Sequence, residues 1–150
     1  MLTTQEMSDR FEIQDLVFRY SQIIDDKDFD ALREEIFSAD AHIDYSVFGG
    51  SKGGLEETID FLKQAMTTEV FPAHQHLNAN IQIRIDGDSA SGRVMCFNPQ
   101  EIALGEGATH LFMLGLWYVD KYRRTDQGWR ITERVEEKSW VFNTPDFMQL

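Results

Sequence analysis

The N-terminal part of the chain places hydrophobic residues at helical spacing. Thr3 or Thr4 followed by Glu6 offers an N-terminal cap, and the apolar positions then recur every three or four residues: Phe11, Ile13, Leu16, Val17, Tyr20, Ile23 and Ile24. This pattern predicts a first helix from about 5 to 25. Asp28 is expected to cap a second helix that carries three apolar residues: Leu32, Ile36 and Phe37.

Between residues 41 and 85 the hydrophobic period changes from helical to alternating. A short strand is expected at 41–45, a glycine-rich loop at 49–54, and a third helix from about 55 to 67 that carries Leu55, Ile59, Phe61, Leu62 and Met66. Beyond Pro72 apolar residues alternate and are expected on one face of a strand: Leu77, Ala79, Ile81, Ile83 and Ile85. The change of period marks the passage from helices to a sheet.

The rest of the chain has the pattern of a strand meander. A turn at Asp86-Gly87 leads into a strand at 90–97, so these residues form a hairpin. Two further strands are expected at about 109–124 and 128–141, joined by the turn 125–128. Helices followed by antiparallel strands predict an α+β fold in which a curved, mostly antiparallel sheet wraps three N-terminal helices.

Composition narrows the class of protein. The 150 residues contain no linker or repeat, so a single domain over 1–150 is expected. A formal net charge of -12 disfavours nucleic acid as a partner. The single cysteine, Cys96, cannot form an internal disulfide, the N-terminus lacks the pattern of a signal peptide, and no apolar run approaches the ~20 residues that span a bilayer. A cytoplasmic protein without a membrane partner is expected.

One face of the first alternating strand is polar and nearly uncharged. It carries His74, His76, Asn78, Asn80, Gln82 and Arg84 at period two. Solvated strand faces usually favour Lys, Glu and Thr, whereas imidazoles and amides are typical of a polar pocket or an interface. A solvated face or a subunit contact is the alternative. His76 and Asn80 are the expected pocket members.

Other polar residues interrupt apolar patterns. Asp25 ends the first helix, where the helix dipole disfavours an acid. Because it directly follows the apolar Ile23 and Ile24, its side chain could point inward and accept a hydrogen bond from a histidine. Arg134 at mid-strand could hold an anionic substrate or leaving group, or it could be an exposed cation that pairs with Glu133 or Glu136. Three tyrosines are expected as core rings with polar tips: Tyr20, Tyr45 and Tyr118.

Common cofactor and nucleophile motifs are absent. The chain has no glycine-rich phosphate loop, no Gly-x-Ser-x-Gly sequence and no zinc-type Cys/His spacing. His74 and His76 could bind a metal only with a third ligand from elsewhere, and the apolar strand around Cys96 favours a core position for that thiol. We therefore expect no cofactor and no metal.

Several short motifs occur together in the order of a known family. They are Arg19-Tyr20-x4-Asp25-x2-Asp28-Phe29-Asp30-x-Leu32, Asp40-Ala41-x-Ile43-Asp44-Tyr45, His76-x3-Asn80, Ile85-Asp86-Gly87-Asp88-x-Ala90, and Tyr118-x-Asp120-x5-Asp126-x-Gly128-Trp129-Arg130-Ile131. Over about residues 8 to 140 they resemble the SnoaL-like branch of the nuclear-transport-factor-2-like (NTF2-like) superfamily. The resemblance implies a cone-shaped, cystatin-like α+β barrel with a deep pocket.

Within that superfamily the chain is similar to scytalone dehydratase, hexachlorocyclohexane dehydrochlorinase and the bile-acid dehydratase, which place an Asp–His pair in the pocket. The resemblance implies Asp25 and His76 as that pair, Tyr45 as the dehydratase tyrosine and Arg134 as the dehydrochlorinase arginine. Scytalone dehydratase has a tyrosine where this chain has Ile24, and its second pocket histidine has only His110 as a candidate counterpart. Scytalone is therefore not the expected substrate.

These features lead to three hypotheses about function. The first is a cofactor-free lyase of the dehydratase, dehydrohalogenase or cyclase type that acts on a small apolar or polycyclic molecule. In it His76 is the base, Asp25 fixes its tautomer and raises its pKa, and Tyr45 or Arg134 assists the departing group. Four residues are expected to contact the substrate: Tyr20, Asn80, His110 and Tyr118. The alternatives are a ligand-binding protein without catalysis and an oxygenase small subunit that scaffolds a partner.

Two expectations concern assembly. A homo-oligomer, either trimer or dimer, is expected because a sheet that covers helices on one side leaves its other face open. The tail at 142–150 is too apolar for a free terminus, so we expect it to close the pocket or to clasp a neighbouring subunit.

Overall fold

The computed structural model describes residues 1–150 and begins with a long helix, α1 (Thr4–Asp26). Thr3 caps it in a capping box, in which the backbone N–H of Glu6 donates to the Thr3 hydroxyl at 3.1 Å. The helix ends at Lys27, which has a left-handed φ of 59°. Its buried face carries Ile13, Leu16, Val17, Tyr20, Ile23 and Ile24. The predicted first helix is confirmed.

The expected second helix is only a short π-helical turn, η1 (Leu32–Ile36), and Phe37 already belongs to strand β1 (Phe37–Asp44). The Asp28 side chain makes no capping hydrogen bond there. A 3-10 turn, η2 (Ser46–Phe48), and a short strand, β2 (Lys52–Gly54), follow, so part of the expected loop pairs with β1. The third predicted helix is confirmed as α2 (Leu55–Ala65).

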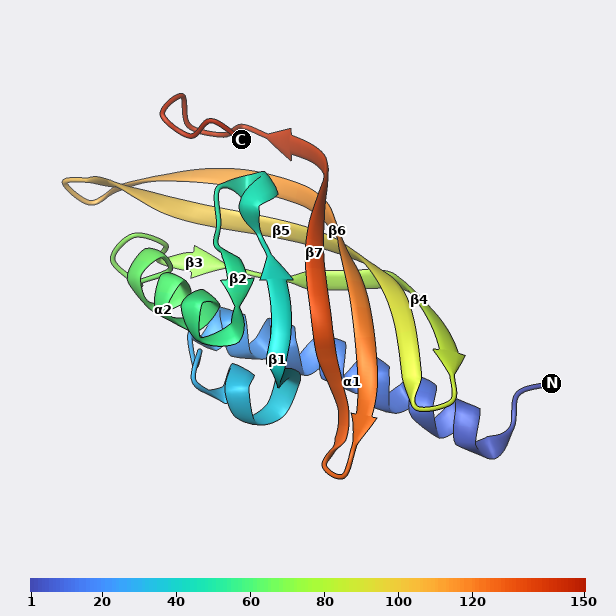
Figure 1. Ribbon diagram of the computed structural model, residues 1–150. Coiled ribbons are helices and arrows are strands. Elements are labelled where there is room, and N and C mark those ends of the chain that lie inside the picture. The colour runs from blue at the N-terminus through green and yellow to red at the C-terminus, as the bar shows by residue number, and fades with distance from the viewer.

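Five more strands complete one seven-stranded sheet (Figure 1). They are β3 (Ala73–His74), β4 (Leu77–Asp86), β5 (Ser89–Gly105), β6 (Ala108–Thr125) and β7 (Gly128–Phe142). The sheet order is β2-β1-β7-β6-β5-β3, with β4 also paired to β5. Only the β1–β7 pair is parallel. The sequence analysis predicted the meander and a short strand at 41–45, most of which lies in β1, but it did not predict β2 or the pairing of β1 with β7.

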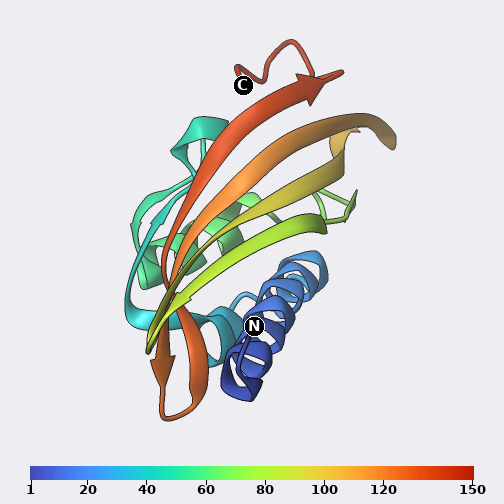
Figure 2. The same ribbon diagram turned by 90° about the vertical axis from the view of Figure 1, so that its right-hand side faces the viewer.

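The sheet curls over α1, as Figure 2 shows, and α2 lies beside it at the end where the chain also terminates (Figure 1). A core of 28 buried hydrophobic residues fills the space between the sheet and the helices. The expected cone-shaped α+β architecture, a curved and mostly antiparallel sheet over helices, is confirmed. None of the helices is long and apolar enough to cross a membrane.

A β-bulge divides β4 between Ala79 and Gln82, where Asn80 has a left-handed φ of 46°. A bulge inserts one residue and so reverses which alternate side chains face inward. Before the bulge the inward side chains are polar: His74, His76 and Asn78. After it they are apolar: Ile81, Ile83 and Ile85. The predicted single apolar face is therefore wrong, and Leu77 is 49% exposed on the outer surface.

Candidate functional site

Asp25 lies in the last turn of α1 and is the centre of a hydrogen-bond cluster. Its Oδ1 accepts hydrogen bonds from Nδ1 of His76 at 2.7 Å and from Nδ1 of His74 at 3.1 Å. Its Oδ2 accepts from the backbone N–H of His76 at 3.1 Å. The structure thus brings the end of the first helix to the two histidines that precede β4.

These hydrogen bonds define the tautomer of both histidines. A carboxylate only accepts, so Nδ1 carries the proton in each ring. Nε2 of His74 then accepts from the Lys27 ammonium at 2.5 Å. Nε2 of His76 has no partner, and this residue lines the neighbouring cavity. His76 is the imidazole of the cluster that is available as a base.

The charges in the cluster follow from burial and hydrogen bonding. Burial acts to raise the pKa of the Asp25 carboxyl, but the hydrogen bonds from His74 and His76 outweigh it and hold that pKa well below its ordinary value. Burial is also the largest influence on His76 and lowers its pKa, against the raising effect of Asp25. The predicted raising effect of Asp25 on the pKa of His76 is thus present, but burial outweighs it and the net shift is downward. His76 is a neutral imidazole at pH 7, as a base requires.

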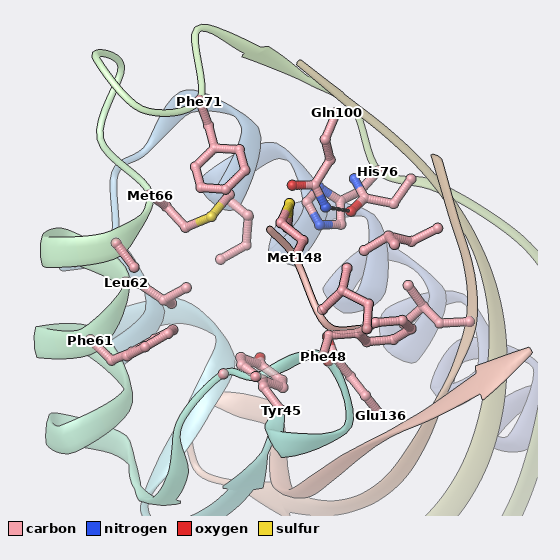
Figure 3. A pocket seen from close by; sticks show the side chains of 18 of the residues that line it. Tyr45, Phe48, Phe61, Leu62, Met66, Phe71, His76, Gln100, Glu136 and Met148 are labelled. Atoms are coloured by element: carbon pink, nitrogen blue, oxygen red, sulfur yellow. Dashed lines mark hydrogen bonds between the residues drawn. The ribbon is translucent and has the colours of Figure 1, made fainter. Parts of the chain in front are cut away.

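A cavity of about 170 Å³ lies beside His76 and is walled by the sheet, α2 and the C-terminal tail (Figure 3). Fifteen of its 21 lining residues are hydrophobic, and a few polar groups are set among them. Such a composition is typical of a small-molecule site. An apolar cavity of about 150 Å³ accepts benzene, so this one has room for a single-ring molecule.

Two tyrosines supply hydroxyl groups to the cavity. The hydroxyls of Tyr20 and Tyr45 lie 2.7 Å apart, and both residues line the cavity together with Tyr118. Burial raises the pKa of Tyr20 to about 12 and that of Tyr45 well above its ordinary value. Both phenols stay protonated at neutral pH, and because one hydroxyl donates to the other, the pair has one proton left to donate to a bound oxygen.

Arg134 lies beneath this part of the cavity and does not line it. Its side chain is 0% exposed, its Nε and Nη2 donate to the Asp120 carboxylate at 2.8 and 2.7 Å, and its guanidinium lies 4.1 Å from the ring centroids of Tyr20 and Tyr118. The surface pairing considered for Arg134 with Glu133 or Glu136 is wrong. A direct contact with a leaving group does not fit this burial, and Arg134 instead positions the two tyrosine rings.

Two of the expected substrate contacts lie outside the cavity lining. Asn80 occupies the bulge and is exposed, and its side-chain amide donates to the Met95 sulfur at 3.8 Å, because the bulge turns the side chain away from the inward row. His110 lies on β6, and its Nε2 donates to the backbone carbonyl of Asn143 at 2.6 Å. His110 therefore anchors the start of the C-terminal tail.

Three polar residues of the cavity were missed by the sequence analysis: Asn98, Gln100 and Glu136. Asn98 donates to the carbonyl of Gln75 at 2.6 Å and accepts a hydrogen bond from Gln100. The spacing of Asn98 and Gln100 could have identified them, because two amides two positions apart in a long apolar strand share a face. Glu136 stands two positions after the inward Arg134 and so shares its face.

The cluster of Asp25, His74 and His76 could in principle offer ligand atoms to a metal, since these lie within 4.8 Å of one another. The Lys27 ammonium already occupies Nε2 of His74, and both Nδ1 atoms donate to the carboxylate. A positive charge at that position opposes a second cation. The donor set fits a hydrogen-bonded proton relay better than a metal centre.

The C-terminal tail forms part of the cavity wall. Met148 and Leu150 line it, and Pro145 is buried. The tail is held at its start by the His110 contact and by the Asn143 side chain, which donates to the Leu111 carbonyl at 2.7 Å. The prediction that the tail packs over the pocket is confirmed.

Deleting residues 143–150 is expected to open the cavity and to lower the free energy of unfolding by about 1–3 kcal/mol, because two apolar side chains lose their burial. Urea unfolding measures the stability, and fluorescence of an apolar dye measures access to the cavity. Gln149→Ala is the matched control, because the Gln149 side chain is exposed. Unchanged stability together with unchanged dye binding would contradict the role of the tail.

Comparison with known proteins agrees with the geometry. The chain is 46% identical over 138 residues to the uncharacterized protein Rv2910c of Mycobacterium tuberculosis, covering 92% of this chain and 90% of that protein. A crystal structure of a candidate scytalone dehydratase from Novosphingobium aromaticivorans has a TM-score of 0.81 at 20% identity, covering 96% and 93% of the two chains. A hexachlorocyclohexane dehydrochlorinase has a TM-score of 0.77 at 16% identity, covering 96% and 94%.

These structural likenesses concern the fold, because their sequence identities are low. The family is shown by a direct match of residues 5–135 to the model of the SnoaL-like domain, which spans α1, the sheet strands up to β7 and the Asp25–His76 pair. The resemblance read from the short motifs is confirmed. This chain belongs to the SnoaL-like domain family.

Proposed function

We propose that this protein is a cofactor-independent lyase that acts on a small ring compound. The observation that carries the proposal is the arrangement of His76: its Nδ1 is bound to Asp25, its Nε2 has no partner, and the ring borders an apolar cavity. A buried neutral imidazole, oriented by a carboxylate, is suited to remove a proton from carbon. The dehydratase and dehydrochlorinase among the structural neighbours support the same reaction class by analogy.

In the proposed reaction Nε2 of His76 takes a proton from a carbon next to a carbonyl group. The Asp25 carboxylate stabilises the imidazolium that forms, and the hydrogen-bonded pair of Tyr20 and Tyr45 donates its free phenolic proton to the oxygen that gains negative charge. A positioned base contributes about 10²–10⁴ to the rate. The substrate must therefore carry an acidified C–H bond, and we infer an enolisable ketone or a similar compound.

The size of the cavity limits the substrate further. A volume of about 170 Å³ admits one ring, and a polycyclic molecule requires the tail at Met148 and Leu150 to move. A ligand-binding protein without catalysis is the second candidate function, favoured by the largely apolar walls. The two candidate functions differ in the expected effect of replacing Asp25 or His76. In a lyase the replacement abolishes turnover, whereas in a protein that only binds its ligand it leaves the binding affinity intact.

The elimination reaction is tested with two small ketones, 3-hydroxycyclohexanone and 3-chlorocyclohexanone, which both give cyclohex-2-enone. Appearance of the enone is followed by its ultraviolet absorbance. The wild-type protein is expected to accelerate elimination relative to the His76→Ala variant, which is the control for uncatalysed reaction. Equal rates with the two proteins, for both ketones, would refute the proposed lyase.

We also propose that the protein forms a homo-oligomer, a trimer or a dimer, through the outer face of the sheet. Leu77, Phe97, Gly115 and Trp140 lie in one row across β4, β5, β6 and β7. The Trp140 ring covers Gly115 and lies 5.8 Å from the Phe97 ring, and the side chains of Leu77 and Trp140 are 49% and 44% exposed. An aromatic row of this kind is typical of an interface.

Light scattering at micromolar concentration is expected to give two or three times the 17.4 kDa mass of one chain. Trp140→Glu is expected to lower the measured mass, because it places a charge in the apolar row. Lys138→Glu on the same strand is exposed outside that row and is the matched control. A mass of 17.4 kDa for the wild-type protein would exclude the oligomer.

A further inference from the structure

Glu136 is an acidic residue in the wall of the cavity. It lies on β7 beside Tyr118 of β6, and its neighbour Val135 pairs with Asp44 at the end of β1. Figure 3 shows Glu136, His76 and Tyr45 at different positions around the cavity that all three line. His76 and Glu136 therefore line the same cavity.

The Glu136 carboxyl group has no hydrogen-bond or ion-pair partner in the protein. The cation that acts on Glu136, Arg134, has Nε and Nη2 bound to Asp120, and its Nη1 is buried without a partner. The other titratable groups that face Glu136 are neutral or acidic: Tyr20, Tyr45, Cys96, Tyr118 and Asp44. Burial, more than the opposing effect of Arg134, raises the pKa of Glu136 to about 8. At pH 7 the side chain is a carboxylic acid.

We propose that Glu136 is the catalytic acid that donates its proton to a leaving hydroxyl group, so that the substrates of this site are β-hydroxy carbonyl compounds. This inference rests on the lyase function proposed above and identifies its leaving group. Hydroxide leaves carbon poorly unless it is protonated, whereas chloride leaves without a proton. A carboxylic acid in an apolar wall is useful only to the first kind of substrate.

The proposed step is balanced in atoms and electrons. Nε2 of His76 takes the proton from the α-carbon, the electrons of that C–H bond form the C=C bond, and the bond between the β-carbon and oxygen breaks. The departing oxygen takes the proton of Glu136 and leaves as water. Glu136 becomes a carboxylate and His76 an imidazolium, and transfer of one proton through solvent from His76 to Glu136 restores both residues.

The inference is tested by comparing the two cyclohexanones in Glu136→Gln, with rates measured above those of His76→Ala. The amide keeps the shape of the side chain but has no acidic proton. We expect the ratio of kcat/KM for the hydroxy ketone to that for the chloro ketone to fall about 10²-fold or more. Glu137→Gln is the control, because Glu137 is exposed and paired with Arg93 on the surface, and it is expected to leave the ratio unchanged.

A pH profile and an infrared spectrum provide readouts that a structural role would not produce. The kcat/KM of the wild-type protein for the hydroxy ketone is expected to fall above about pH 8, where Glu136 loses its proton, and that for the chloro ketone is not. The infrared difference between wild type and Glu136→Gln at pH 7 is expected to show the C=O stretch of a protonated carboxyl group.

The possible failures are distinguishable. An equal loss for both ketones in Glu136→Gln, or a carboxylate spectrum for Glu136 at pH 7, would overturn its role as acid while the lyase function stands. Elimination from neither ketone by the wild-type protein would remove the lyase function, and the role of Glu136 with it.

Discussion

Replacing His76 with alanine is expected to remove essentially all catalysed elimination while leaving the fold intact. The imidazole is the base, and its removal leaves Asp25 with His74 and a cavity that still binds the ketone. Initial rates of enone formation measure the loss, and circular dichroism checks the fold. Retained turnover in a folded His76→Ala protein would show that another group takes the proton.

Asp25→Asn is the sharper test of the same pair, because the amide keeps the shape and loses the charge. Its NH2 group can face Nδ1 of His76 and favour the tautomer with the proton on Nε2, which cannot act as a base. We expect kcat to fall about 10²-fold or more. Asp26→Asn, at the exposed neighbouring acid, is the matched control and should retain full activity.

The double variant shows whether Asp25 and His76 act as one unit. Partners in one catalytic step are strongly non-additive, so Asp25→Asn combined with His76→Ala is expected to be hardly slower than His76→Ala alone. Losses that multiply in full would mean that the two residues act independently. The mechanism proposed here would then fail.

Asp120→Asn is expected to cause the largest loss of stability among single substitutions in the sheet. The change leaves the fully buried Arg134 without its counter-ion and also removes the acceptor charge for the Tyr122 hydroxyl, which donates to Asp120 at 2.8 Å. Breaking a buried ion pair on one side costs about 3–5 kcal/mol. Urea unfolding measures the change in the free energy of unfolding.

The control for this prediction is Asp126→Asn in the exposed turn between β6 and β7. Replacing both partners, as in Asp120→Leu combined with Arg134→Met, is expected to recover much of the lost stability, because no buried charge remains. A loss below about 1 kcal/mol for Asp120→Asn, the range of exposed ion pairs, would contradict the assigned burial.

Helical periodicity and the turn residues were sufficient to predict most of the fold. The first and third helices and the β4–β5 and β6–β7 hairpins lie where local pattern placed them, because each is specified by residues close in sequence. The parallel pairing of β1 with β7 was not predictable in this way. It joins residues about 90 positions apart, such as Ile43 and Arg134, and no local signal marks that contact.

In the candidate site, too, residues with a local sequence signal were predicted, and residues placed by distant contacts or by the bulge were not. Asp25 and His76 were recognised from an acid at a helix end and a histidine in a polar strand face, and the structure brings them to 2.7 Å. Asn80 was wrongly predicted to face the pocket, because the alternation of side chains was continued through position 80 and no sequence signal marks the bulge there. For Arg134 the sequence left a substrate contact and a surface ion pair open, and neither was right, because its partner, Asp120, lies on another strand.

The bulge at Asn80 lets one strand carry two separate tasks. The segment before it supplies polar contacts to Asp25 and the cavity, and the segment after it supplies isoleucines to the core. Substitutions on one side need not be compensated on the other, since the two inward rows do not share a register. Deleting the extra residue at the bulge would shift the register by one, so that either the polar row or the isoleucine row would face outward.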